Sequence, residues 1–153
     1  MLDSRNLMPC RYRIDTEQSL VVSTAWGRVT FADMKAHQDE LASNPLFKPE
    51  FYQFVDATAV KELDVSLDEA RKLAERKMFS SSSRRAFLGS GLSMSAAVLR
   101  LAEAYFRVVE KRESISVFHD REAALKWLGL VKLPQQELET PDLETTKREC
   151  VND

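Results

Sequence analysis

The stretch FYQFVDATAVKELDVSLDEARKLAERK, residues 51–77, contains the change from strand to helix that decides the fold. Residues 51–59 form a short apolar run rich in aromatic side chains, which is typical of a buried strand. After the connection VKELD, residues 60–64, apolar and charged side chains separate onto two faces of a predicted helix. Its apolar face comprises Leu67, Ala70, Leu73, Ala74 and Met78. The stretch therefore predicts a strand, a connection and an amphipathic helix.

Ser66, at the start of this helix, has two interpretations. With Glu69 it matches the S-x-x-E capping box, in which the hydroxyl and the carboxylate each accept a backbone N–H of the first turn. A phosphate on Ser66 would also be favoured by the helix dipole and the free N–H groups. The carboxylates of Asp64, Asp68 and Glu69 would oppose that phosphate by like-charge repulsion. We expect capping to be the first role of Ser66 and regulation the second.

Strands and helices alternate on both sides of this unit. Further strands are predicted at 11–15, 19–30, 84–90 and 114–120. Further helices are predicted after Thr30, which with Asp33 resembles a capping box, after the cap Asp120, and from Met94 to Val109. Gly129 is predicted to end the last helix. The order ββαβαβαβα predicts a single α/β domain of about five strands and four helices. Its mixed, mostly parallel sheet should carry an antiparallel N-terminal hairpin.

The two ends of the chain differ from this regular centre. We expect residues 1–10 to be a flexible leader, residues 11–131 to form the domain, and residues 132–153 to be an acidic, disordered tail. From Pro134 onward the tail carries six acidic and two basic residues and little apolar content. Such a segment cannot bury enough apolar surface to offset the entropy of ordering.

Composition excludes several classes of protein. The chain has 153 residues and a formal net charge of −2, so it lacks the basic footprint that drives binding to nucleic acid. Cys10 and Cys150 have no CxxC partner and no histidine at ligand spacing, which argues against structural zinc. No secretory signal and no apolar run of about 20 residues is visible. We therefore expect a cytoplasmic protein that binds neither nucleic acid nor membrane.

Four stretches together resemble the SpoIIAA-like branch of the STAS superfamily, named for sulfate transporters and anti-sigma-factor antagonists. They are YRID…LVVSTAWGRVTFADMKAHQDEL, QFVDATAVKELDVSLDEARKLAE, RRAFLGS and SISVFHDREAALKWLG, and they span residue 12 to about residue 129. The resemblance rests on hydrophobic pattern and element order. It implies a bacterial, STAS-like fold and a regulatory role through protein–protein interaction.

The same resemblance gives Ser66 its regulatory interpretation. In the anti-sigma-factor antagonists, a D-S-S-G-type turn opens a helix, and phosphorylation of its second serine by a partner kinase abolishes binding. Asp64 matches the acid of that turn and Ser66 the phosphorylated serine. Val65 and Leu67 replace the other serine and the glycine, so the close backbone approach that glycine permits is lost.

Other candidates lie where strands of such a sheet end, the usual place for function in open α/β sheets. Asp56, with Asp64 and Ser66, is a candidate for partner binding. Gly89, Ser90 and Gly91 are weak candidates for anion binding, because their glycine-rich turn lacks the third glycine of a dinucleotide loop and the Lys-Ser/Thr of a Walker loop.

His119 and Asp120 could form a nucleophile–base–orienter set with Ser66 or Ser90, but the chain has no G-x-S-x-G elbow. We expect His119 to be a solvated residue at a strand end and Asp120 to be a cap. His37 should have a half-buried structural role on its helix.

Two functions remain open from the sequence. The leading hypothesis is a non-catalytic interaction or regulatory module with no cofactor, no metal and an unidentified protein partner, either as a monomer or as a homodimer. The alternative is a small-molecule binding protein with an apolar or anion-binding pocket between helices. A deep, partly apolar cavity with convergent polar groups would favour the alternative.

Overall fold

Five strands form one mixed sheet in the computed structural model, which describes residues 9–89, 96–109 and 114–130. The strands are β1 (Cys10–Asp15), β2 (Leu20–Thr30), β3 (Tyr52–Asp64), β4 (Arg84–Leu88) and β5 (Ser114–Phe118). Their order in space follows the chain. β1 and β2 are antiparallel, and all later neighbours are parallel. The predicted α/β fold with element order ββαβαβαβα is confirmed.

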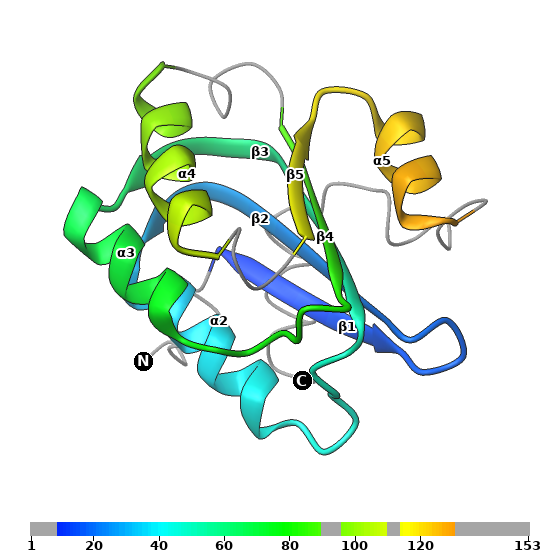
Figure 1. The fold of residues 1–153 in the computed structure, drawn as a ribbon. Helices are drawn as coiled ribbons and strands as arrows, with labels where there is room; N and C mark the ends of the chain where they lie inside the picture. Colours follow the sequence, from blue (N-terminus) through cyan, green and yellow to red (C-terminus); the bar gives the residue numbers. More distant parts are fainter. Residues whose placement is uncertain (1–8, 90–95, 110–113, 131–153) are drawn as a thin grey trace, which may run out of the picture.

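The helices cover the two faces of the sheet unequally. They are α2 (Phe31–Ser43), α3 (Leu67–Glu75), α4 (Ala96–Val109) and α5 (Arg121–Leu128). Each of α2, α3 and α4 connects two neighbouring parallel strands, and right-handed crossovers place all three on one face. Figure 1 shows these three helices on one side of the sheet and α5 alone on the other.

Two apolar clusters follow from the alternation of side chains along the strands. On the α5 face, Leu20, Val22 and Phe54 belong to a buried cluster with three side chains of α5. Val21 points to the opposite face and packs with Leu41 of α2. Both faces of the central strands are therefore buried, as expected for parallel strands between helical layers.

The predicted connection at residues 60–64 is wrong, because these residues continue β3. They pair with the last part of β2, where Arg28 lies opposite Glu62 and Thr30 opposite Asp64. Two register shifts interrupt this pairing, and Gly27 beside them adopts a positive φ of +65°. Such irregularities break the period of two that marks a strand in sequence and bend the ribbon. The long β2–β3 pair therefore extends well past the end of β4.

The predicted caps form, but α3 ends at Glu75, before Met78, which was predicted on its apolar face. One predicted core residue is also exposed. Both predicted capping boxes form, at Thr30 and at Ser66, and the side chain of Asp120 accepts from the Glu122 N–H. Gly129 has the left-handed φ of 80° that ends α5. Leu67 was predicted on the apolar face of α3 but is 40% exposed, because it lies in the first turn with its side chain outside the helix packing.

The predicted leader and tail fall mostly outside the described residues. Within the leader, Pro9 accepts a hydrogen bond from the Trp26 N–H at 2.9 Å, and Cys10 begins β1. The tail, residues 132–153, lies wholly outside them, as do Ser90 and Gly91. In the part of the chain that is described, every helix is too short or too polar to cross a membrane.

Candidate ligand-binding site

A cavity of about 230 Å³ lies between the sheet and the three helices α2, α3 and α4. β2, β3 and β4 supply its floor, and the helices supply its walls. Its surface is mostly apolar, with Leu41, Val55, Leu73, Phe87 and Phe106 among the lining side chains. A largely apolar, partly enclosed space of this kind is what small-molecule sites usually consist of.

A row of hydrogen-bonded polar side chains crosses the floor of this cavity. Gln53 Nε2 donates to Ser23 Oγ at 3.1 Å, and Arg85 Nε donates to Gln53 Oε1 at 3.0 Å. At one end His37 Nε2 lies 3.1 Å from Ser23 Oγ, and at the other Arg85 Nη1 donates to the Tyr105 hydroxyl at 3.0 Å. The row therefore joins α2 to α4 across three strands. We call these five residues the polar row.

The strand register explains why the polar row forms. Gln53 of β3 lies opposite Arg85 of β4, and both side chains point to the helical face because Phe54 and Ala86, their neighbours in sequence, point to α5. The three strand residues of the row are deeply buried: Ser23 and Gln53 are 4% exposed and Arg85 is 6% exposed. His37 and Tyr105 at its two ends are half-buried. Buried polar groups at this depth need partners, and the row supplies them to its own members.

The guanidinium of Arg85 is surrounded by aromatic rings. Its Cζ atom lies 4.4 Å from the ring centroid of Phe79, 5.6 Å from that of Phe87 and 5.7 Å from that of Tyr105. The negative faces of such rings attract a cation, most strongly where water is excluded. The rings and the hydrogen bonds to Gln53 and Tyr105 thus hold a positive charge in a fixed orientation beside the cavity.

His37 at the other end of the row is neutral at physiological pH. Burial, and secondly the positive charge of Arg85, lowers the pKa of His37 to about 4. Its ring also lies against that of Tyr12, with centroids 5.4 Å apart. The predicted half-buried position of His37 on its helix is correct, and the side chain takes part in the lining of the cavity.

Arg76 connects α3 to α2 at the wall of the cavity. It forms an ion pair with Asp39, donates to Gln38 Oε1 at 3.2 Å and donates to the Lys35 carbonyl at 3.3 Å. The hydrogen bonds from Arg76 and then Lys35 hold the pKa of Asp39 below its ordinary value. Arg76 is the C-cap residue of α3, and its side chain reaches across to the neighbouring helix α2.

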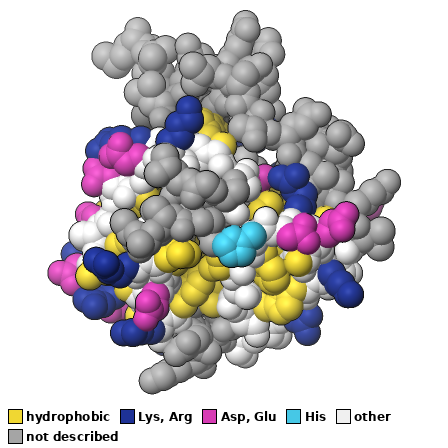
Figure 2. Space-filling view, turned by 90° about the horizontal axis from the view of Figure 1, so that it is seen from above, with side chains coloured by type: hydrophobic (Ala, Val, Ile, Leu, Met, Phe, Trp, Pro, Cys, Tyr) yellow, Lys and Arg dark blue, Asp and Glu magenta, His cyan; other side chains and the backbone are white. Residues whose placement is uncertain are grey.

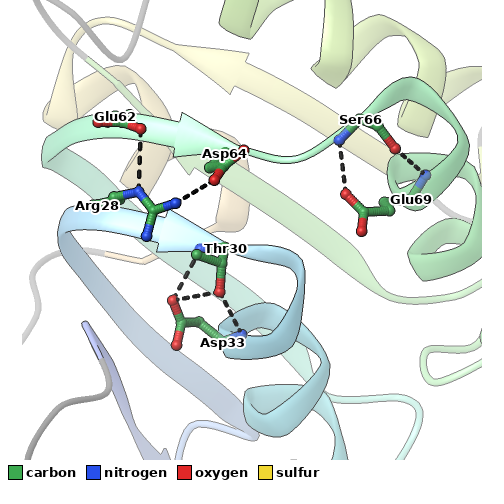
Figure 3. A network of polar contacts seen from close by, with 7 residues as sticks. All are labelled: Arg28, Thr30, Asp33, Glu62, Asp64, Ser66 and Glu69. Atoms are coloured by element: carbon green, nitrogen blue, oxygen red, sulfur yellow. Dashed lines mark hydrogen bonds and ion pairs between the residues drawn. The ribbon is translucent and has the colours of Figure 1, made fainter.

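Asp64 and Ser66 lie at the end of the β2–β3 extension, away from the polar row. Arg28 binds Glu62 and Asp64 together, while Ser66 exchanges capping hydrogen bonds with Glu69 (Figure 3). The Ser66 hydroxyl accepts the Glu69 N–H at 3.1 Å, and the Glu69 carboxylate accepts the Ser66 N–H at 2.9 Å. The predicted capping role of Ser66 is confirmed.

Asp56 lies in the middle of β3 rather than at a strand end. Its Oδ2 forms an ion pair with Arg121 of α5 at 3.0 Å, and its Oδ1 accepts from the Thr58 N–H and hydroxyl at 3.0 and 2.6 Å. Asp64 follows Asp56 by eight positions along the strand, roughly 26 Å at the usual rise. The structure therefore does not bring these two predicted candidates together, and Asp56 ties α5 to the irregular part of β3.

The remaining candidates lie near the ends of β4 and β5. Gly89 is buried and donates its N–H to the Phe118 carbonyl at 3.0 Å, whereas Ser90 and Gly91 are outside the described residues. His119 is exposed, as predicted. Figure 2, seen from above, shows hydrophobic side chains in the middle of the face and charged side chains on either side. Across the described ranges, no three His, Cys, Asp or Glu side chains converge as metal ligands would.

Sequence reasoning missed Ser23, Gln53, Arg85 and Tyr105 as functional candidates. One signal was available: Gln53 and Arg85 are polar residues inside runs that otherwise read as strands buried on both faces. A polar side chain in such a run must find a buried partner. The sequence did not identify that partner, because it lies on another strand.

One solved structure that is similar to this chain is the crystal structure of an uncharacterized protein from the DUF3478 family with a SpoIIAA-like fold, from Shewanella loihica PV-4. The two share 25% identity with a TM-score of 0.50, over 78% of this chain and 93% of that chain. This chain has a SpoIIAA-like fold. No family model matches the sequence, and no curated protein matches it. The predicted SpoIIAA-like resemblance is thus confirmed as a statement about fold.

Proposed function

We propose that this SpoIIAA-like domain is a binding module for a small, mainly apolar molecule held in the cavity between the sheet and α2–α4. The observation that carries the proposal is the 230 Å³ space itself, with apolar walls and the polar row across its floor. Apolar surface would supply most of the affinity, and a few placed polar groups would set orientation. This is the alternative that the sequence left open.

The volume limits the size of the ligand. An engineered cavity of roughly 150 Å³ in another protein holds one benzene molecule. A space of 230 Å³ therefore suits a compact molecule of about eight to twelve non-hydrogen atoms. Larger ligands would require the helices to move apart.

A pair of substitutions on one helix tests this proposal. Ala102 of α4 lines the cavity, whereas Ala104 on the same helix is outside its lining. Ala102→Leu should fill part of the space and weaken binding of 1-octanol about tenfold or more, as measured by titration calorimetry. Ala104→Leu should bind like the wild type. If 1-octanol, toluene and octanoate all fail to bind the folded wild-type protein, the proposal is wrong.

A regulatory interaction at Ser66 is a second candidate function. The supporting observation is that Ser66 is exposed and stands beside Leu67, a large apolar side chain that is 40% exposed. An exposed hydroxyl next to an exposed apolar contact is a surface that a partner protein can bind and a kinase can modify. A phosphate there would replace the hydrogen bond to the Glu69 N–H and face the Glu69 carboxylate.

The second candidate needs a control that separates capping from partner recognition. Thr30 provides it, because it caps α2 with the same box geometry. Capture from lysate with wild type, Ser66→Glu and Thr30→Ala should show a protein that binds the wild type and Thr30→Ala but not Ser66→Glu. A partner that binds the wild type and both variants equally would contradict this role. It would also be contradicted if incubation with kinases added no phosphate at Ser66.

A further inference from the structure

We propose that the ligand carries an uncharged carbonyl group and that the hydroxyl of Tyr105 donates a hydrogen bond to its oxygen. This inference rests on the proposed function and adds the chemical class of the ligand, a neutral carbonyl compound with a compact apolar body. Three features support it: the unused hydrogen of the Tyr105 hydroxyl, the direction of the hydrogen bonds in the polar row, and the apolar lining of the cavity.

Tyr105 lines the cavity from α4 and has one unused donor. Its oxygen accepts a hydrogen bond from Arg85 Nη1 at 3.0 Å, which leaves the hydrogen of the hydroxyl to be donated elsewhere. No described residue accepts that hydrogen. The side chain is half-buried, so the hydroxyl lies beside an apolar space without an acceptor from the described part of the chain. Such a donor can be satisfied by a ligand.

Arg85 fixes the roles of the atoms along the polar row. A guanidinium donates hydrogen bonds and never accepts them, so the Gln53 amide must turn its oxygen to Arg85 and its nitrogen to Ser23. The oxygens of Gln53, Ser23 and Tyr105 therefore each accept a hydrogen bond from another member of the row. The groups that find no acceptor among the described residues are donors, namely the Tyr105 hydroxyl and the second amide hydrogen of Gln53. Such a row favours a ligand that accepts hydrogen bonds.

The hydrogen bond from Arg85 also makes the Tyr105 hydroxyl a stronger donor. A cation that donates to the phenolic oxygen draws electron density away from the O–H bond, and linked hydrogen bonds reinforce one another where water is excluded. The same bond holds the oxygen in place across the space between β4 and α4. A ligand carbonyl would therefore meet a donor that is already polarised and positioned.

The rest of the lining favours an uncharged acceptor. The side chains around the cavity are mostly apolar, and one of them, Phe106, has its ring centroid 6.1 Å from that of Tyr105. A charged head group among such side chains would lose its hydration at a large cost, whereas a carbonyl oxygen needs only one donor in exchange. A neutral carbonyl compound thus matches both the apolar walls and the unused hydroxyl hydrogen.

Two ligands of one shape and one variant test the inference. Acetophenone and 2-phenylpropene have the same skeleton, but acetophenone has a carbonyl oxygen where 2-phenylpropene has a methylene group. Tyr105→Phe removes only the hydroxyl. Titration calorimetry should show that this variant binds acetophenone about fivefold more weakly than the wild type and binds 2-phenylpropene equally well. Each ligand is compared with itself in two proteins, so its cost of leaving water cancels.

Tyr12→Phe is the matched control. The Tyr12 hydroxyl donates to the Glu40 carbonyl at 3.3 Å, and this residue is outside the lining of the cavity. The control variant should bind both ligands like the wild type. If Tyr105→Phe weakens both ligands equally, or weakens neither, the hydroxyl does not recognise the carbonyl, and the inference is overturned while the cavity remains a ligand site.

An infrared spectrum of the wild-type complex keeps the inference testable if Tyr105→Phe does not fold. The carbonyl stretch of isotope-labelled acetophenone should lie at lower frequency in the complex than in hexane, because a hydrogen bond to the oxygen weakens the C=O bond. A frequency equal to that in hexane would overturn the inference. If neither ligand binds the wild type, the inference is wrong, and the proposed function is also wrong if 1-octanol, toluene and octanoate fail to bind as well.

Discussion

The two faces of the sheet differ in how they use buried space. On the α5 face, Leu20, Val22, Phe54, Ala86 and Leu88 pack with α5 in one apolar cluster, and each is at most 3% exposed. On the α2–α4 face, the same strands carry the polar row and border a cavity. One sheet thus has a closely packed side and a side with room for a ligand.

This difference indicates that the α5 face mainly stabilises the fold and that the α2–α4 face is the one suited to binding. Close packing removes apolar surface from water and maximises dispersion contacts, so the α5 face should dominate the stability of the fold. The α2–α4 face is less closely packed, because it borders the cavity, and it contains the buried guanidinium of Arg85. A face that is less well packed than it could be is a feature of binding sites rather than of structural cores.

The largest expected effect contrasts one aromatic ring on each face. Phe54→Ala should lower the free energy of unfolding by about 3–5 kcal/mol, because it removes a fully buried ring from the packed cluster. Phe106→Ala should cost less, because that ring is only half-buried and borders the cavity. Urea unfolding followed by circular dichroism measures both. Equal losses would show that the two faces are packed alike.

Acid should destabilise the protein through His37 on the cavity face. The pKa of His37 is about 4 in the folded protein against an ordinary value of 6.5. Between these values the unfolded chain binds more protons, so this contribution to stability is complete above about pH 6.5 and is lost as the pH falls toward 4. At pH 5 the loss should be about 2 kcal/mol.

His37→Gln is the variant that isolates this effect. The difference in unfolding free energy between the wild type and His37→Gln should shift by about 2 kcal/mol between pH 7.5 and pH 5. His119→Gln, which changes an exposed histidine, serves as the control. A difference between the wild type and His37→Gln that is independent of pH would mean that the fold does not hold the His37 ring neutral.

Removal of one hydroxyl tests the polar row. Ser23→Ala should destabilise the protein by about 1–3 kcal/mol, because His37 and Gln53 would each lose a buried hydrogen-bond partner. Ser43→Ala removes an exposed hydroxyl that donates to the Glu40 carbonyl and should have a smaller effect. Unfolding by urea compares the two. Similar losses in both variants would show that the row contributes little to the cavity face.

The smallest expected effect concerns the caps, which belong to neither face. Ser66→Ala and Thr30→Ala should each cost about 1 kcal/mol, because each removes the acceptor for a first-turn N–H. Ser66→Asp should remain close to the wild type, since aspartate caps as well as serine. Thermal unfolding can rank the three variants. A Ser66→Asp variant as unstable as Ser66→Ala would remove the capping interpretation.

Element order, caps and the N-terminal hairpin could be predicted because they depend on residues close together in the chain. Thr30 and Asp33 stand three residues apart, as do Ser66 and Glu69, and both boxes form as predicted. The end of β3 could not be predicted. Register shifts against β2 interrupt the alternation over residues 57–62, and only the pairing with Arg28 and Thr30 shows that the strand continues.

The candidate site was the least predictable part of the molecule. Ser23 and Gln53 are 30 residues apart, and Gln53 and Arg85 are 32 apart. In the sequence, each of these three residues is only a single polar position within a predicted strand. The parallel register of β2, β3 and β4 places them in one row, and α4 adds Tyr105 from a fourth segment.

Sequence information was sufficient for the α/β class, the SpoIIAA-like resemblance and the capping role of Ser66, since hydrophobic period and capping depend on short-range contacts. Tertiary structure decided where the cavity lies, that Arg85 is buried beside it, that His37 is neutral, and that Asp56 binds Arg121. The physical reason is that right-handed crossovers bring strands about 30 residues apart into contact. Burial and partners depend on that contact, and the local pattern does not encode it.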